Sequence, residues 1–124
     1  MSTTLFEKLG GKIGISKIVD DTVDNHMNNP AINARFLPLK SEPEKLAVIK
    51  KHTIDFFSMG SGGPAHYSGK DMETAHRGMN ISPGEYVHTV DDIFAALNKN
   101  GIDDSAKKEV LFILWSLKGM IIAK

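Results

Sequence analysis

Helical segments separated by glycine and proline are the feature that most restricts the fold of this chain. Apolar residues recur at helical spacing in several stretches, such as residues 110–121, and no stretch shows the alternating pattern of a β-strand. Glycine, asparagine or proline interrupts the chain after these stretches, for example at residues 10–11, 28–30 and 60–64. The sequence therefore predicts an all-α protein with five or six helices.

Capping motifs predict where several of these helices begin. A serine or threonine followed three residues later by glutamate can satisfy the free N–H groups of a helix N-terminus. The motifs are Thr4 with Glu7, Ser41 with Glu44, and Ser82 with Glu85. Asp103 or Ser105 can cap the last helix. We also expect a short helix at residues 32–37 and a short segment with an apolar inner face formed by Met72, Ala75 and Met79.

Length, charge and cysteine content exclude several classes of protein. The 124 residues suffice for one hydrophobic core, so we expect a single domain over residues 1–124. Fifteen basic residues balance fifteen acidic ones, and without a positive excess nucleic acid is not an expected partner. The chain has no cysteine, which excludes disulfides, thiolate metal sites and the C-x-x-C-H attachment of c-type haem.

The start of the chain and its most apolar run bear on its location. The first residues, MSTTLFEKLGG, lack the basic and apolar regions of a signal peptide. Residues 110–117 are the most apolar run and fall far below the ~20 residues that a bilayer span needs. We therefore expect a cytoplasmic protein with no membrane span, and we expect a monomer.

Five histidines are the main candidates for site chemistry, although a structural or surface role is the ordinary expectation for each. His52 shares a predicted helix face with apolar neighbours, and His76 ends the short segment described above. Two histidines in apolar surroundings can meet across a planar ligand or a metal, but further ligands for a closed zinc site are not evident. His26, His66 and His88 are expected to be structural or solvated.

Other kinds of site find little support in the sequence. No Ser–His–Asp grouping is visible, and the glycines at residues 60–63 are not followed by the Gly-Lys-Ser/Thr of a phosphate-binding loop. These glycines are better explained as a helix stop.

The order and spacing of several motifs resemble those of the truncated haemoglobins, and most closely their first group. The motifs are LFEKLGG, VDD, Phe36 after Asn-Asn-Pro, GGPAHYSGKDM, and AHRGM around His76. Together they cover nearly the whole chain. The resemblance implies a truncated globin fold, a two-over-two helical sandwich around haem b, in which paired glycines allow the globin helices to be shortened.

The resemblance also implies a haem site. In this family the histidine of the short segment after the second glycine pair is the proximal iron ligand, which is His76 here. The other residues implied to surround the haem are Phe36, Ile49, His52, Thr53, Phe56, Lys70, Met72, Met79, Tyr86 and Val90. Among Lys50, Lys51 and Lys70, the match of YSGKDM favours Lys70 as the cation beside the haem propionates.

The distal side departs from the family pattern. Val23 stands where the family usually has a tyrosine that donates a hydrogen bond to the gas ligand, and Ile49 stands at a common glutamine position. His52 lies where some relatives have a histidine able to close onto the iron, with Thr53 beside it. We hypothesise that His52 is a second iron ligand when no gas is bound. The alternatives are that His52 donates a hydrogen bond to the ligand or turns toward solvent or a propionate.

Three classes of function stay open at this point. The leading one is a b-type haem protein that reversibly binds oxygen, carbon monoxide or nitric oxide. The second is an enzyme, a nitric oxide dioxygenase or a peroxide-handling haem protein, which would need an external reductase because no flavin or nicotinamide motif is present. The third is a haem-free helical interaction module, and failure to bind haem would point to it.

Overall fold

The computed structural model describes residues 4–124, and this part of the chain is helical without a strand. A single backbone bridge joins Ile81 to Ile122. The helices are α1 (Leu5–Lys8), α2 (Gly11–Asn28), η1 (Asn33–Arg35), η2 (Leu37–Ser41), α3 (Pro43–Gly60), α4 (Met72–His76), α5 (Pro83–Lys99) and α6 (Asp104–Ile121), where η denotes a 3-10 helix. The prediction of an all-α protein is confirmed.

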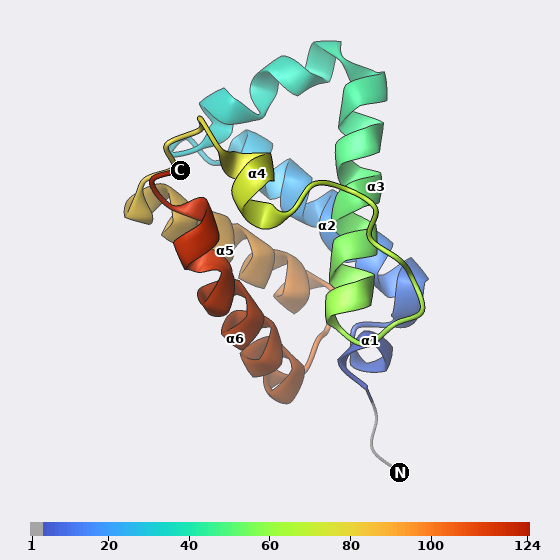
Figure 1. Ribbon diagram of the computed structural model, residues 1–124. Coiled ribbons are helices and arrows are strands. Elements are labelled where there is room, and N and C mark those ends of the chain that lie inside the picture. The colour runs from blue at the N-terminus through green and yellow to red at the C-terminus, as the bar shows by residue number, and fades with distance from the viewer. Residues whose placement is uncertain (1–3) are drawn as a thin grey trace.

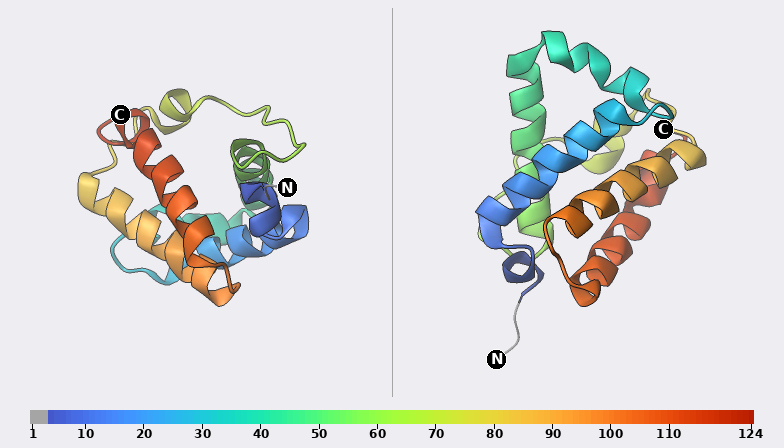
Figure 2. Two further views of the ribbon diagram at one scale, coloured as in Figure 1. Left: turned by 90° about the horizontal axis from the view of Figure 1, so that it is seen from below. Right: turned by 180° about the vertical axis from the view of Figure 1, so that it is seen from behind.

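The four long helices form two layers of two. Helix α2 packs against both α3 and α5, and α5 packs against α6 (Figure 1). The view from behind in Figure 2 shows α2 lying beside α5. The short helix α4 packs against α6. Within residues 4–124, no helix has both the length and the apolar character needed to cross a bilayer.

The hydrophobic core lies mainly between α2, α5 and α6. Its most enclosed large side chains include Ile15, Leu97 and Val110, which are at most 2% exposed. Helix α3 contrasts with this, because Ser58 is its only buried residue, and α4 has none. The side of the molecule that carries α3 and α4 therefore keeps its apolar residues only partly covered.

Most of the predicted helix starts are confirmed. Ser82 and Glu85 form a complete capping box at the start of α5. The side chain of Thr4 accepts a hydrogen bond from the backbone N–H of Glu7 at α1. At α6 the cap is Asp103, whose carboxylate accepts from the N–H of Ala106.

The predicted capping box at Ser41 is wrong. Helix α3 begins after Glu42, whose side chain makes no capping hydrogen bond. Ser41 belongs to η2, and its hydroxyl donates to the carbonyl of Pro38 at 2.9 Å. Because η2 continues to residue 41, this hydroxyl turns back to the preceding turn and does not reach the N–H groups of α3. The short helix expected at residues 32–37 is present as the 3-10 helix η1, and a second 3-10 helix, η2, follows it.

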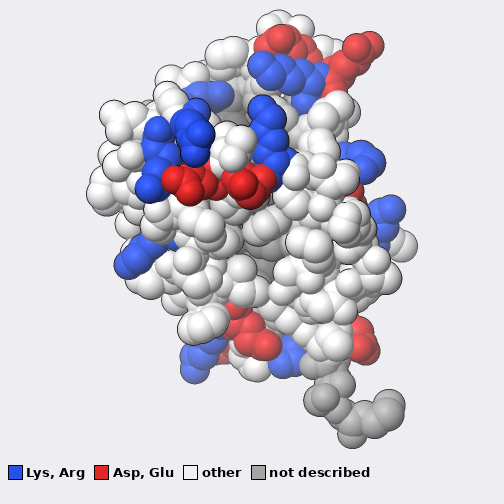
Figure 3. Space-filling model, viewed as in Figure 1, with Lys and Arg blue, Asp and Glu red and all other residues white. Residues whose placement is uncertain are grey.

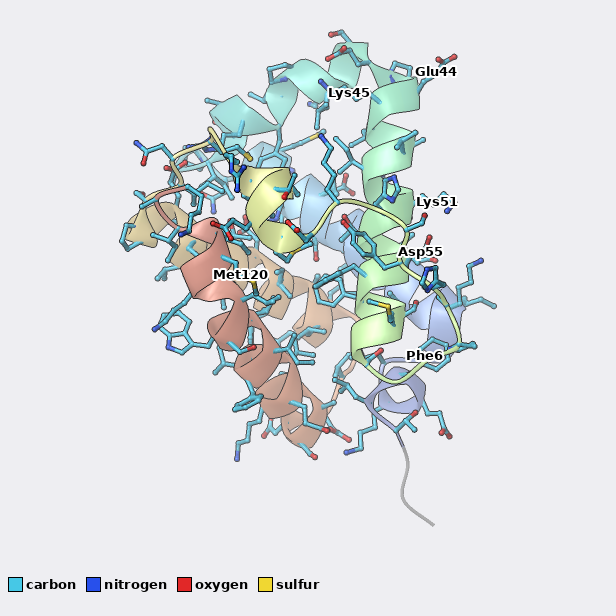
Figure 4. The ribbon with its side chains drawn as sticks, viewed as in Figure 1. Phe6, Glu44, Lys45, Lys51, Asp55 and Met120 are labelled. Carbon is cyan, nitrogen blue, oxygen red and sulfur yellow. The ribbon has the colours of Figure 1, made fainter. Side chains whose placement is uncertain are left out.

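The glycine pair at residues 62–63 is explained by close packing against α1. The backbone N–H of Phe6 donates to the carbonyl of Ser61 at 2.9 Å, which draws α1 against the chain that leaves α3. A Cβ atom at Gly63 would lie 2.3 Å from the ring of Phe6. Figure 4 shows Phe6 beside this stretch of chain. Only glycine fits here, and Gly62 has a φ of 92°, which also favours glycine.

Candidate functional site

The proximal candidate, His76, is the last residue of α4 and is half-buried. Asp71 starts this helix by accepting a hydrogen bond from the N–H of Thr74 at 2.7 Å, and hydrogen bonds from Thr74 lower the pKa of Asp71. The Nδ1 atom of His76 lies 2.7 Å from the carbonyl oxygen of Met72. A carbonyl can only accept, so Nδ1 carries a proton, and in the neutral ring Nε2 then keeps its lone pair. This hydrogen bond favours the tautomer that binds a metal through Nε2.

The distal candidate, His52, lies on α3 and is also half-buried. Its ring packs edge-on against Tyr67, with 6.0 Å between the ring centroids. Its Nδ1 atom is buried and has no hydrogen-bond partner in the described part of the chain. A buried N–H without an acceptor is costly, so in this position the proton belongs on Nε2. His52 then offers an N–H donor and no free lone pair on its Nε2 atom.

The neighbours of His52 offer no further side-chain donor. The hydroxyl of Thr53 donates to the carbonyl of Ile49 at 2.8 Å, as threonines in helices often do. Ile49 is 38% exposed, and Val23 packs against the hydrophobic core. Among the residues predicted to line the distal side, His52 is the one that can still contribute a polar interaction.

The other residues predicted to contact haem differ in what they pack against and in how far they are exposed. Phe36 stacks on His26 at a centroid distance of 4.7 Å, and Phe56 packs edge-on against Tyr67 at 5.3 Å. Met72 packs against the core, whereas Met79 is 37% exposed. The structure therefore divides these residues between the interior and the surface.

Tyr86 and Val90 both belong to the buried core, on α5. The hydroxyl of Tyr86 donates to the carbonyl of Leu114, which ties α5 to α6, and burial raises the pKa of this phenol. The role of these predicted residues as haem contacts stays a prediction.

The three lysines considered for the propionates differ in their partners. Lys50 pairs with Asp20 at 3.1 Å, and Lys51 pairs with Asp55 at 2.9 Å on the outer side of α3 (Figure 4). Lys70 is exposed and forms no ion pair with the other residues between 4 and 124. Its ammonium group is the one available to an added anion. In Figure 3 the middle of the face that carries α4 is largely uncharged, and charged groups gather around it.

Three features of this region were not found from the sequence. Tyr67 covers His52, Arg35 contacts both α5 and the turn after α4, and His26 is buried. The aromatic residue in a glycine-rich turn could have drawn attention to Tyr67. The partners of Arg35 and His26 are 44 to 66 residues away in the chain, and no local pattern shows them.

His26 was expected to be structural or solvated, and the structure shows a buried residue that pairs with Asp92 at 2.7 Å. Burial lowers the pKa of this imidazole, and the Asp92 carboxylate partly opposes that shift. Asn29 also donates to both carboxylate oxygens of Asp92 at 3.2 Å. His26 therefore supports the end of α2 rather than serving as a free ligand.

Two cavities lie near the surface, and neither is lined by His52 or His76. An open groove of about 500 Å³ lies between α1, the end of α3 and α6. A smaller apolar cavity of about 30 Å³ lies next to it, because Leu5 and Ile113 line both. Within residues 4–124, no group of three or more His, Asp or Glu side chains is placed to hold a metal ion.

The residues present fit a haem bound through one histidine. A haem supplies four of the iron ligands itself, so a single imidazole with a free Nε2 suffices on the protein side. The partly covered apolar residues of α3 suit the face of such a ring, and His52 on the same helix has a buried Nδ1 atom without a partner in the described part of the chain. A two-over-two helical sandwich with this site defines a globin.

Comparison with known proteins supports this class. A model of the bacterial-like globin family matches residues 4–122. A group 1 truncated haemoglobin of Tetrahymena thermophila is 31% identical over 101 residues, which cover 82% of this chain and 79% of that protein. The chain therefore belongs to the bacterial-like globin family and, within it, to the group I truncated haemoglobins. It is a haem-binding globin, and globins bind diatomic gases.

Solved structures show the same fold. The Fe(III) form of the truncated haemoglobin from Tetrahymena pyriformis superposes with a TM-score of 0.87 at 25% identity, covering 98% of this chain and all of that one. The 2/2 haemoglobin of Synechococcus, in a cyanomet form with covalently attached haem, gives a TM-score of 0.81 at 21% identity and 94% coverage of both chains. The two-over-two fold predicted from the sequence is confirmed.

Proposed function

We propose that this protein is a b-type haem protein that reversibly binds oxygen, carbon monoxide or nitric oxide, with His76 as the proximal ligand. The observation that carries the proposal is the hydrogen bond of 2.7 Å from the Nδ1 of His76 to the carbonyl of Met72. This bond fixes the tautomer and the orientation of the ring, and it leaves Nε2 free to bind. A bound haem would supply an iron atom that binds a diatomic ligand.

The absence of cysteine and the side chains near His52 and His76 support a haem of the b type, which is held without a covalent bond. Without cysteine, the protein has no thiol for a c-type attachment. Apolar side chains of α3 and α4, such as Ile49, Phe56 and Met72, suit the faces of a planar apolar ring. The unpaired ammonium of Lys70 suits a propionate.

On the distal side, His52 acts in two positions. When its ring lies against Tyr67, Nδ1 is buried and Nε2 carries the proton, so the side chain donates a hydrogen bond to a ligand in the pocket. If the ring turned away from Tyr67, water could reach Nδ1 and the proton could move there, which would leave the lone pair of Nε2 free to hold a haem iron. An internal ligand competes with gas, so the apparent gas affinity falls in proportion to the closed fraction.

The visible spectrum of the hemin-reconstituted protein, reduced under nitrogen, tests this proposal. Ligation by His52 predicts the sharp, split bands of a six-coordinate low-spin haem, and His52→Leu should convert them to one broad band. A low-spin spectrum that persists in His52→Leu would remove His52 from this role. A single broad band in the unaltered protein would leave His52 only as a hydrogen-bond donor.

A further inference from the structure

The chain that directly follows His76 is held by contacts with distant parts of the molecule. Between α4 and α5, Gly78 and Asn80 have φ values of 87° and 46°, so this turn does not continue the helix. The backbone N–H of Met79 donates to the carbonyl of His76 at 3.1 Å. The position of this turn therefore bears directly on the backbone of His76.

The C-terminal residues hold one side of this turn. The N–H of Gly78 donates to the carbonyl of Lys124, and the N–H of Ala123 donates to the carbonyl of Ile81, both at 2.8 Å. These bonds form a short parallel contact that includes the bridge between Ile81 and Ile122. Because α4 also packs against α6, the proximal segment is attached to the end of α6.

Arg35 holds the other side of the turn. Its Nε and Nη2 atoms bind the two carboxylate oxygens of Glu85 at 2.5 and 3.2 Å, and the same Nη2 donates to the carbonyl of Met79 at 3.0 Å. Glu85 also accepts from the backbone N–H of Ser82 at the start of α5. One guanidinium thus joins η1, the turn after His76 and the N-terminus of α5.

The ion pair is partly covered and stays charged at neutral pH. The side chains of Arg35 and Glu85 are 29% and 26% exposed. The hydrogen bond from Arg35 is the main reason that the pKa of Glu85 falls to about 2. A fork of this kind needs the planar arrangement of guanidinium donors, which a lysine does not provide.

We propose that Arg35 is a positioning residue for the proximal histidine, and this rests on the proposed role of His76. Arg35 immediately precedes Phe36, one of the residues that the resemblance implies to surround the haem. By fixing the carbonyl of Met79, Arg35 ties η1 and the start of α5 to the backbone that carries His76. Loss of this contact loosens the turn and weakens the hold of His76 on the iron.

The first test measures the haem-free protein. Amide hydrogen exchange at Met79 and Gly78 should be faster in Arg35→Gln and Arg35→Lys than in the unaltered chain. Lys99→Gln is the matched control, because it removes an ion pair with Asp21 at 3.1 Å on the α2–α5 side. It should leave exchange at the turn unchanged. Equal exchange in the Arg35 variants and the control would overturn the proposal.

The second test measures the haem-loaded protein in a His52→Leu background, where His76 is the only protein ligand. Arg35→Gln should raise the rate of hemin transfer to excess apomyoglobin roughly tenfold, as is typical for residues that orient a metal ligand. It should also shift the iron–histidine stretching band in the resonance Raman spectrum, which Lys99→Gln should not do. Faster exchange at the turn with an unchanged band would make Arg35 merely structural and overturn the proposal.

Glu85→Gln separates the ion pair from the helix cap. Glutamine at this position can still accept from Ser82, so α5 keeps its start while Arg35 loses its charged partner. A shift in the same direction as Arg35→Gln is expected, and no shift at all would contradict the part assigned to Glu85. If His76→Gly leaves the haem spectrum unchanged, the role of His76 itself fails, and the exchange measurement still shows whether Arg35 holds the turn.

Discussion

The two sides of this molecule differ in how completely they bury their own apolar surface. Where α2, α5 and α6 meet, Ile15, Leu97 and Val110 are almost fully enclosed by other side chains. Within helices α3 and α4, only Ser58 is buried, and apolar residues such as Ile49 stay partly exposed. The first side is a core that the chain completes by itself. The second keeps apolar residues incompletely covered, and we propose that haem covers them.

The sharpest way to test this difference is to truncate one aliphatic residue on each side. Leu97→Ala should lower the free energy of unfolding by about 3 kcal/mol, with or without hemin, because it leaves a cavity in an enclosed core. Ile49→Ala should cost much less in the haem-free protein and more once hemin is bound. Denaturant unfolding followed by circular dichroism, with and without hemin, measures both. Equal costs for Ile49→Ala in the two states would contradict the contrast.

A smaller effect is expected from a substitution at Val23, which stands where the family usually has a tyrosine that donates a hydrogen bond to the gas ligand. Val23→Tyr introduces a phenol that can donate a hydrogen bond to the ligand, worth about 1.5 kcal/mol, or roughly tenfold slower oxygen dissociation. Val23→Phe is the control for size, because Val23 packs against the core. Stopped-flow release of oxygen compares the variants. Identical rates for tyrosine and phenylalanine would show that His52 already supplies this interaction or that residue 23 does not reach the ligand.

Features that depend on residues close together in the chain could be predicted from the sequence. Helix starts at Thr4 and Ser82 were predictable because a cap and its N–H partner lie three residues apart. Ser41 has the same local pattern, but its hydroxyl donates to the carbonyl of Pro38 in η2. The spacing of residues in the sequence does not show this competing hydrogen bond. The two-over-two arrangement and the proposed role of His76 came from a family resemblance, since composition and periodicity alone predicted an all-α protein with two histidines and no assigned metal.

The contacts that support the site were beyond sequence reasoning for a physical reason. Arg35 and Glu85 are 50 residues apart, and His26 and Asp92 are 66 residues apart. Each is a polar pair made only when helices distant in the chain pack together. Periodicity reports which face of a helix is apolar, and it does not identify the residue on the neighbouring helix.

Removing helix caps should have a still smaller effect and tests the corrected start of α3. Ser82→Ala should lower the free energy of unfolding by about 1 kcal/mol, because the backbone N–H of Glu85 loses its partner. Ser41→Ala should change it by less than about 0.5 kcal/mol, since its hydroxyl only donates to Pro38. Thermal or denaturant unfolding of the two variants is sufficient. A comparable loss at Ser41 would restore it as a cap.

The mildest expected effect is a pH dependence on the enclosed side. Burial lowers the pKa of His26 below its usual value of 6.5, so the unfolded chain binds a proton there more readily than the folded one. Stability should therefore be highest above this value and fall as the pH drops below about 6.5. Unfolding free energies at pH 7.5 and about 5.5 should differ more for the unaltered protein than for His26→Gln. An equal loss of unfolding free energy in the unaltered protein and in His26→Gln would show that His26 is not the cause.

The assignment of His76 as the residue that holds haem is tested most directly by removing its side chain and returning it in solution. The unaltered protein should bind added hemin with a Soret band shifted from that of free hemin. His76→Gly should lose this band position, and imidazole added to His76→Gly should restore it, because the small molecule can occupy the place of the side chain. A spectrum of His76→Gly that matches the unaltered protein without imidazole would contradict the account.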